Sequence, residues 1–149
     1  MSAKTLAFLG GGNMAEALIK GVLAGGAAEP KSIRVADPLK ARRAFLADTY
    51  GVEVAEGNKE AMSGAGLVIL AVKPQVLDEV LVEIQDEVGE AQVVVSIAAG
   101  VTIAHIHSHL YADTKVVRAM PNTPALVGEP PQNGFVLKLS HSSSNSMQL

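Results

Sequence analysis

A glycine-rich stretch near the start of the chain carries the strongest sign of chemistry. It reads Gly10-Gly11-Gly12-Asn13-Met14-Ala15, the pattern G-x-G-x-x-A, directly after an apolar run and before a segment of helical period. In such a turn the first glycine permits a tight bend, the second lets a pyrophosphate approach the backbone, and the small last residue allows close helix–strand packing. Free amides and the positive dipole at the helix start hold the phosphates. We therefore expect a dinucleotide here rather than a turn without a ligand.

An acidic residue stands where the adenosine ribose of such a cofactor would lie. Asp37 ends the second predicted strand, about 20 positions after the turn, and its carboxylate could accept from both ribose hydroxyls, which favours NAD. Lys40, Arg42 and Arg43 follow at once and could pair with a 2′-phosphate, which favours NADP. Alternatively, Lys40 and Arg43 only coat a solvated helix face. The residues therefore leave NADP or NAD as the cofactor.

Three histidines have a spacing that could suit a metal. On a helix His105 and His109 share a face, while His107 points away from it. The chain has no cysteine, and no clear carboxylate partner accompanies these histidines in the sequence. We therefore expect exposed helix histidines and no metal site.

The elements that would position these residues alternate between short apolar runs and longer helical segments. Strands are predicted at residues 5–10, 33–37, 52–55, 67–72, 92–98 and 115–120, and helices at 15–24, 39–50, 75–88 and 102–110. In the third helix Val76, Val80, Ile84 and Val88 would share one face, and Gly51 would cap the second helix. The pattern predicts an α/β fold: a doubly wound, mostly parallel Rossmann-type sheet of about six strands with helices on both faces. Ligands of such sheets bind beyond the carboxyl ends of the strands.

Composition narrows the class of protein. The 149 residues are 48% hydrophobic but only 3% aromatic, as in helices packed on a buried parallel sheet, and the net charge of -3 gives no sign of a nucleic-acid surface. No signal peptide or apolar run of membrane-spanning length is visible. We expect a cytoplasmic protein with a small-molecule substrate and neither nucleic acid nor membrane as a partner.

Four segments together resemble one family. FLGGGNMAEALIKG, LAVKPQ, VVSIAAGVTI and RAMPNTPALVGE are similar, in order and spacing, to segments of pyrroline-5-carboxylate reductases. The resemblance covers residues 5 to about 129, and its last two motifs are highly specific. It implies reduction of 1-pyrroline-5-carboxylate to proline by hydride transfer from NAD(P)H. A deazaflavin-dependent NADP reductase of the same fold is an alternative, against which MPNTPALVG argues.

The resemblance also implies roles for individual residues, while no catalytic residue is identified. It implies that the glycine turn contacts the pyrophosphate and that Asp37 and Asn58 contact the adenosine ribose. The segment after strand four would line the nicotinamide ribose, and the segment after strand five would lie near the nicotinamide. The cofactor-binding set is Leu9, Gly10, Gly11, Gly12, Asn13, Met14, Asp37, Asn58, Ala71, Val72, Lys73, Pro74, Ala98, Ala99 and Gly100. The edge of the substrate pocket is formed by Met120, Pro121 and Asn122. By itself, Asn58 would be read as the N-cap of a short helix beginning at Lys59.

The family pattern stops after Glu129. Residues 1–128 form the predicted dinucleotide-binding domain, and residues 129–149, with paired prolines and many serines, form a divergent tail expected to be disordered apart from a short strand at FVLKL. Members of the family continue with a helical domain that forms homo-oligomers and supplies much of the substrate site. That domain is expected to be absent here, so the alternative to an active reductase is a non-catalytic dinucleotide-binding fragment.

Overall fold

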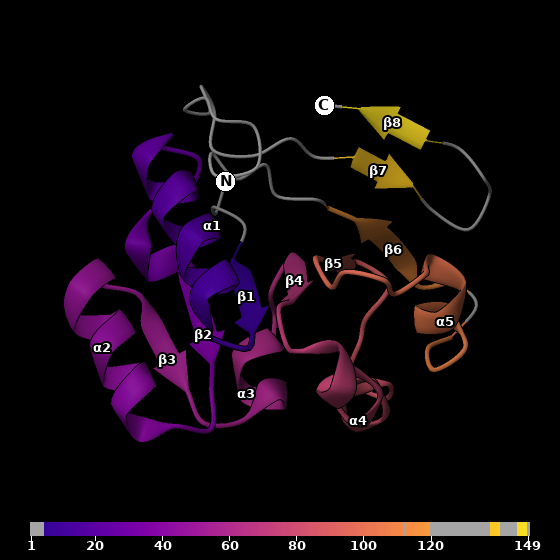
Figure 1. The fold of residues 1–149 in the computed structure, drawn as a ribbon, viewed down its shortest axis with the longest axis horizontal. Helices are drawn as coiled ribbons and strands as arrows, with labels where there is room; N and C mark the ends of the chain where they lie inside the picture. The colour runs from indigo at the N-terminus through magenta and orange to yellow at the C-terminus, as the bar shows by residue number, and fades with distance from the viewer. Residues whose placement is uncertain (1–4, 112, 120–137, 141–145, 149) are drawn as a thin grey trace.

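A six-stranded parallel sheet forms the centre of the protein (Figure 1). The computed structural model describes residues 5–111, 113–119, 138–140 and 146–148. The sheet has the order β3-β2-β1-β4-β5-β6, and every neighbouring pair is parallel. Its strands are β1 (Leu6–Leu9), β2 (Ile33–Ala36), β3 (Glu53–Ala55), β4 (Leu67–Leu70), β5 (Val93–Ser96) and β6 (Lys115–Arg118). The order reverses between β1 and β4, which confirms the doubly wound prediction.

In the part of the chain that the structure describes, five helices cover the two faces of this sheet. They are α1 (Asn13–Ala24), α2 (Lys40–Tyr50), α3 (Asn58–Met62), α4 (Pro74–Ile84) and α5 (Ile103–His107), with a 3-10 turn, η1 (Pro30–Ser32), before β2. Phe8 of β1 packs with buried residues of α1 and α2, whereas its neighbours Ala7 and Leu9 pack with α3, α4 and α5. Because successive side chains of a strand point to opposite faces, one strand serves two cores.

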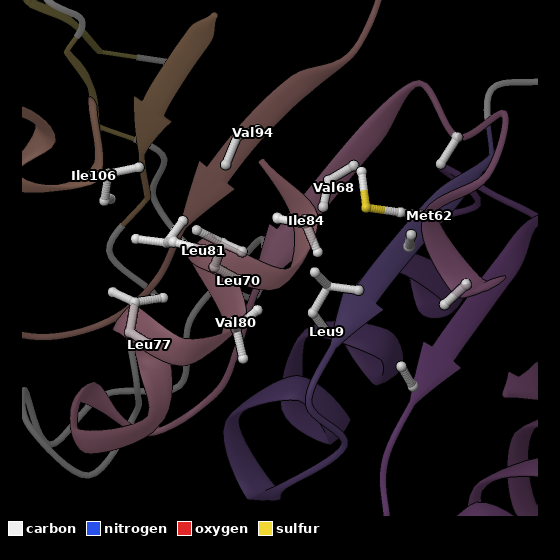
Figure 2. Packing of buried hydrophobic residues seen from close by; sticks show 14 of the residues in the cluster. Leu9, Met62, Val68, Leu70, Leu77, Val80, Leu81, Ile84, Val94 and Ile106 are labelled. Carbon is white, nitrogen blue, oxygen red and sulfur yellow. The ribbon is translucent and has the colours of Figure 1, made fainter. Parts of the chain in front are cut away.

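The core beneath α3, α4 and α5 is made of aliphatic side chains and one methionine. Figure 2 shows the side chains of the helices meeting those of the central strands. The labelled residues are Leu9, Met62, Val68, Leu70, Leu77, Val80, Leu81, Ile84, Val94 and Ile106. Burying apolar side chains on both sides of the sheet explains the uniformly apolar LVIL of β4.

The prediction for the third long helix was correct in place but wrong in two details. Helix α4 ends at Ile84 rather than at Val88, and its buried residues are Leu77, Val80, Leu81 and Ile84. Val76 is exposed. A helix has 3.6 residues per turn, so a strict four-residue repeat drifts around the axis by about 40° at each step. The repeat therefore begins off the buried face at Val76 and reaches it only at Val80 and Ile84.

Two predictions about helix ends have opposite outcomes. Gly51 caps α2 as expected: its φ is 74° and its amide donates to the carbonyl of Ala47 at 2.9 Å. Asn58, however, is the first residue of α3, and Gly57 is the N-cap, so the N-cap reading of Asn58 is wrong by one position. The Asn58 amide donates to Glu83 of α4 at 2.9 Å instead.

The two described pieces beyond residue 137 form an antiparallel pair. They are β7 (Lys138–Ser140) and β8 (Ser146–Gln148), and in Figure 1 β7 runs beside β6. Residues 129–137, 141–145 and 149 lie outside the described part, so the disordered tail stays a prediction. Within the described residues, no helix combines the length and the apolar character that crossing a membrane requires.

Candidate cofactor-binding site

The carboxyl ends of neighbouring strands are joined by hydrogen bonds that continue beyond the strands themselves. These bonds run from the Gly10 amide to the Ala36 carbonyl at 2.8 Å, from Ala71 to Leu9 at 2.9 Å, from Ile97 to Leu70 at 3.3 Å and from Ala119 to Ser96 at 2.9 Å. The segments that follow β1, β2, β4, β5 and β6 therefore begin at one edge of the sheet. This edge is where ligands of doubly wound sheets bind.

Gly10 makes the sharp turn after β1 and lies against the segment after β4. Its φ is +105°, and a Cβ placed on it would lie 2.9 Å from the carbonyl carbon and oxygen of Ala71 and 3.0 Å from the amide nitrogen of Val72. A side chain has no room there, and the backbone conformation itself favours glycine. The structure thus brings the glycine turn into direct contact with the Ala71–Val72 peptide.

Gly12 differs from Gly10 because it faces open space. It is the N-cap of α1, it is exposed, and a Cβ placed on it would meet nothing within 4 Å. Asn13 and Met14 of the first helical turn are exposed as well. The first amides of a helix have no partner within the helix and carry the positive end of its dipole. The arrangement fits a pyrophosphate, which needs free amides and a position without a side chain.

Asp37 is fixed next to this turn by two backbone amides. Its Oδ2 accepts from the Gly11 amide at 3.0 Å, and its Oδ1 accepts from the Leu39 amide at 2.9 Å. Because an ionised carboxylate offers about four acceptor positions, two remain for other donors. The glycine turn and Asp37, which are far apart in the sequence, are therefore in direct contact in the fold.

A polar cluster that the sequence did not predict supports the turn from the side of α2. Arg42 donates through Nε to the carbonyl of Gly11 and through Nη2 to Glu16 of α1 at 2.7 Å. The Tyr50 hydroxyl donates to the other oxygen of Glu16. The hydrogen bonds from Tyr50 and Arg42 hold the pKa of Glu16 below its usual value, and the same carboxylate raises the pKa of Tyr50. Sequence reasoning considered Arg42 only as a phosphate contact, since nothing in the pattern links residues 16, 42 and 50.

The remaining predicted cofactor residues fall into three groups. Leu9 is buried at the end of β1, and Asn58 is half-buried at the start of α3. Lys73 is the N-cap of α4 and Pro74 its first residue, and both are exposed. After β5, Ala98 is buried, whereas Ala99 and Gly100 are exposed. Met120, Pro121 and Asn122, the predicted edge of the substrate pocket, lie outside the described residues.

The histidines have a neighbour that the sequence did not reveal. His105 Nε2 lies 2.6 Å from Oδ1 of Asp78 on α4, and His109 Nε2 lies 3.6 Å from the same oxygen. The expectation that no carboxylate accompanies them is therefore wrong. Asp78 is distant in sequence and reaches the histidines because α4 and α5 cover the same face of the sheet.

Fold and site together define a doubly wound dinucleotide-binding domain. The family model described as "NADP oxidoreductase coenzyme F420-dependent" matches residues 5–100, and the chain belongs to this family. Within the curated relatives, the chain is 42% identical over 124 residues to pyrroline-5-carboxylate reductase of Escherichia coli (strain K12), covering 83% of this chain and 46% of the relative. The resemblance predicted from the motifs is thereby confirmed.

Solved structures agree with this assignment. A pyrroline-5-carboxylate reductase from Coxiella burnetii is 34% identical, with a TM-score of 0.77 over 85% of this chain and 47% of that one. Plasmodium falciparum pyrroline carboxylate reductase, solved with NADP bound, is 27% identical, with a TM-score of 0.72 over 87% of this chain and 46% of that one. The chain thus spans less than half the length of each of these three relatives.

Proposed function

We propose that this chain is the cofactor-binding part of an enzyme that reduces 1-pyrroline-5-carboxylate to proline, the last step of proline biosynthesis. The observation that carries the proposal is the open space at Gly12, at the start of α1 and beside Asp37. The names of the relatives support the substrate, and the NADP-bound structure of one of them supports the cofactor.

The residues at the strand ends would hold and orient the cofactor. The amides at the start of α1 would bind the pyrophosphate, Asp37 and Asn58 the adenosine ribose, and residues 71–74 and 98–100 the nicotinamide half. A bound NADPH or NADH would supply a hydride to the carbon of the protonated C=N bond, whose π electrons would move to nitrogen to give the amine of proline. Such chemistry asks the protein mainly for position and electrostatics.

The preference for NADP or NAD depends on the side chains that follow β2: the cations Lys40, Arg42 and Arg43, and the carboxylate of Asp37. Arg42 has two guanidinium nitrogens engaged, Nε by the Gly11 carbonyl and Nη2 by Glu16, whereas Arg43 has one engaged. Arg43 donates to the carbonyls of Asp37 and Pro38, and Lys40 is exposed at the first turn of α2. We therefore assign any phosphate contact to Lys40 and Arg43, opposed by the charge of Asp37.

Two other functions remain as alternatives. The family description includes coenzyme F420, which corresponds to the deazaflavin-dependent NADP reductase considered above. The second alternative is a dinucleotide-binding fragment without turnover. It is suggested by the fact that the chain spans less than half the length of these relatives. Identity of 42% to a pyrroline-5-carboxylate reductase favours the imine reductase over the deazaflavin enzyme.

The three functions are separated by one set of turnover measurements. Oxidation of NADPH is followed with 1-pyrroline-5-carboxylate, and separately with oxidised coenzyme F420, for two proteins. One is the 149-residue chain, and the other carries the C-terminal half of the Escherichia coli relative in place of residues 130–149. We expect the chimera to reduce 1-pyrroline-5-carboxylate and the 149 residues alone to do so on the order of a thousandfold more slowly, because hydride transfer depends steeply on the pose of the substrate.

Each outcome identifies one function. Comparable turnover by the two proteins would show that the substrate site lies within residues 1–129. Turnover with coenzyme F420 and none with 1-pyrroline-5-carboxylate would replace the imine reductase by the deazaflavin enzyme. Binding of NADPH without turnover by either protein would leave the non-catalytic function.

A further inference from the structure

A cluster of two imidazoles and one carboxylate lies between α4 and α5, and it contains no residue of the cofactor site. His105 lies in α5 and His109 in the turn that follows it, and their ring centroids are 5.3 Å from each other. Asp78 comes from α4, and the three potential ligand atoms all lie within 4.8 Å of one another. A single carboxylate oxygen, Oδ1, approaches the Nε2 atoms of both histidines.

Buried neighbours of these residues hold the two segments in place. Ile106 and Leu110 alternate with the histidines and are buried against the sheet. Leu77 and Leu81 anchor α4 on either side of Asp78 and belong to the same core. The backbone positions of the three polar residues are therefore set by packing, while their side chains stay partly open to solvent: Asp78 is 57% exposed, His105 45% and His109 27%.

Two of the three ligand distances are close to those of a metal site. With metal–ligand bonds of about 2.0–2.2 Å, the corners of a tetrahedral site lie about 3.3–3.6 Å apart. The separation of 3.6 Å between His109 and Asp78 already meets this value. The separation of 2.6 Å between His105 and Asp78 is that of a hydrogen-bonded pair, and it must open by less than about 1 Å to admit an ion. Exposed side chains can make such a movement by small rotations.

We propose that Asp78, His105 and His109 bind a divalent transition-metal ion of the zinc class and thereby link α4 to α5. Two histidines with one carboxylate are a recurrent ligand set for zinc. Three protein ligands leave a fourth position for water. Imidazole nitrogen selects zinc, nickel or copper over magnesium and calcium, which prefer oxygen ligands.

The test is calorimetric titration of the 149-residue chain with zinc chloride, with and without excess magnesium chloride. We expect saturable binding of one Zn²⁺ per chain that magnesium does not displace. Asp78→Ala, His105→Ala and His109→Ala should each weaken binding at least about tenfold. Zn²⁺ should also raise the midpoint of thermal unfolding of the unchanged chain by a few degrees, because it binds only the folded arrangement.

Matched controls separate this site from weak binding to any histidine or carboxylate. His107→Ala removes the histidine of α5 that lies outside the cluster, and Glu79→Ala removes the exposed carboxylate next to Asp78; both should leave the affinity unchanged. His141 stays in every variant, so its contribution is constant. Absence of saturable binding, or equal loss in the control variants, would overturn the proposal. Because three independent variants remove one ligand each, a folding defect in one leaves the other two decisive.

Discussion

Asp37 and Gly11 are joined by a hydrogen bond of 3.0 Å from the Gly11 amide to Oδ2 of Asp37. The acidic residue at the end of β2 is thereby fixed against the glycine turn after β1, and a second bond from the Leu39 amide fixes its other oxygen. Both carboxylate oxygens are oriented before any ligand arrives. A preoriented acceptor loses little conformational freedom when ribose hydroxyls bind.

Replacing Asp37 should therefore change the preference between the two cofactors. In Asp37→Ser the negative charge that would repel a 2′-phosphate is lost, and we expect the ratio of NAD to NADP affinities to move toward NADP by about tenfold. Calorimetric titration with each cofactor gives this ratio. A loss of folded protein would affect both titrations equally and therefore does not change the ratio. Asp48→Ser, at an exposed position of α2, removes an equal charge and should leave the ratio unmoved. An unchanged ratio in Asp37→Ser would remove this residue from the ribose site.

A methyl group at Gly10 should destabilise the fold. Gly10→Ala combines a φ of +105° with a Cβ at 2.9 Å from the Ala71 carbonyl, and we expect a loss of about 2–3 kcal/mol in the free energy of unfolding. Gly12→Ala, at an open position with a φ of -79°, should cost less than about 1 kcal/mol. Urea unfolding of the two variants measures the difference. Equal costs would show that the contact between the turn and Ala71 does not constrain Gly10.

Glu16 should make stability depend on pH in a defined direction. Hydrogen bonds from Tyr50 and Arg42 lower the pKa of its carboxyl below the ordinary 4.5, so the folded state binds this proton less readily than the unfolded chain. The stabilisation is fully present above the unfolded pKa and is lost as pH falls through the folded pKa. At pH 7 we expect Glu16→Gln to unfold about 1 kcal/mol more easily than the unchanged chain.

The same variant tests whether the pH dependence of stability has the expected sign. The stability difference between the unchanged chain and Glu16→Gln should shrink as pH falls below about 4.5. Glu79→Gln, which removes an exposed carboxylate of α4, serves as the control and should show a much smaller difference at pH 7. A difference for Glu16→Gln that stays constant or grows on acidification would contradict the assigned hydrogen bonds.

The sequence predicted the sheet well because its signals are local. Most strands are short, largely apolar runs, and each is followed by a turn or a helix start, so the alternation could be read directly. The end of α4 was placed four residues too far because Val88 continues the four-residue repeat of apolar residues, although the helix stops at Ile84. Such boundaries depend on packing that periodicity does not encode.

The parts of the site that escaped prediction depend on contacts between distant residues. Asp78 meets His105 only through the packing of α4 beside α5, and Arg42 meets Glu16 and Gly11 only through the approach of α2 to α1. The glycine turn and Asp37, in contrast, belong to a pattern whose spacing is set by one strand–helix–strand unit. Their positions were predictable, whereas the cofactor contacts themselves remain predictions.

Whether a dinucleotide binds across the start of α1 is tested most directly at Gly12. Gly12→Val places a branched side chain where the structure has open space, and Gly89→Val makes the same change at an open position between α4 and β5, away from the strand ends. Calorimetric titration with NADPH and with NADH should show at least about a hundredfold weaker binding in Gly12→Val, equivalent to about 2.7 kcal/mol, and unchanged binding in Gly89→Val. Unchanged affinity in a folded Gly12→Val would contradict the proposed site.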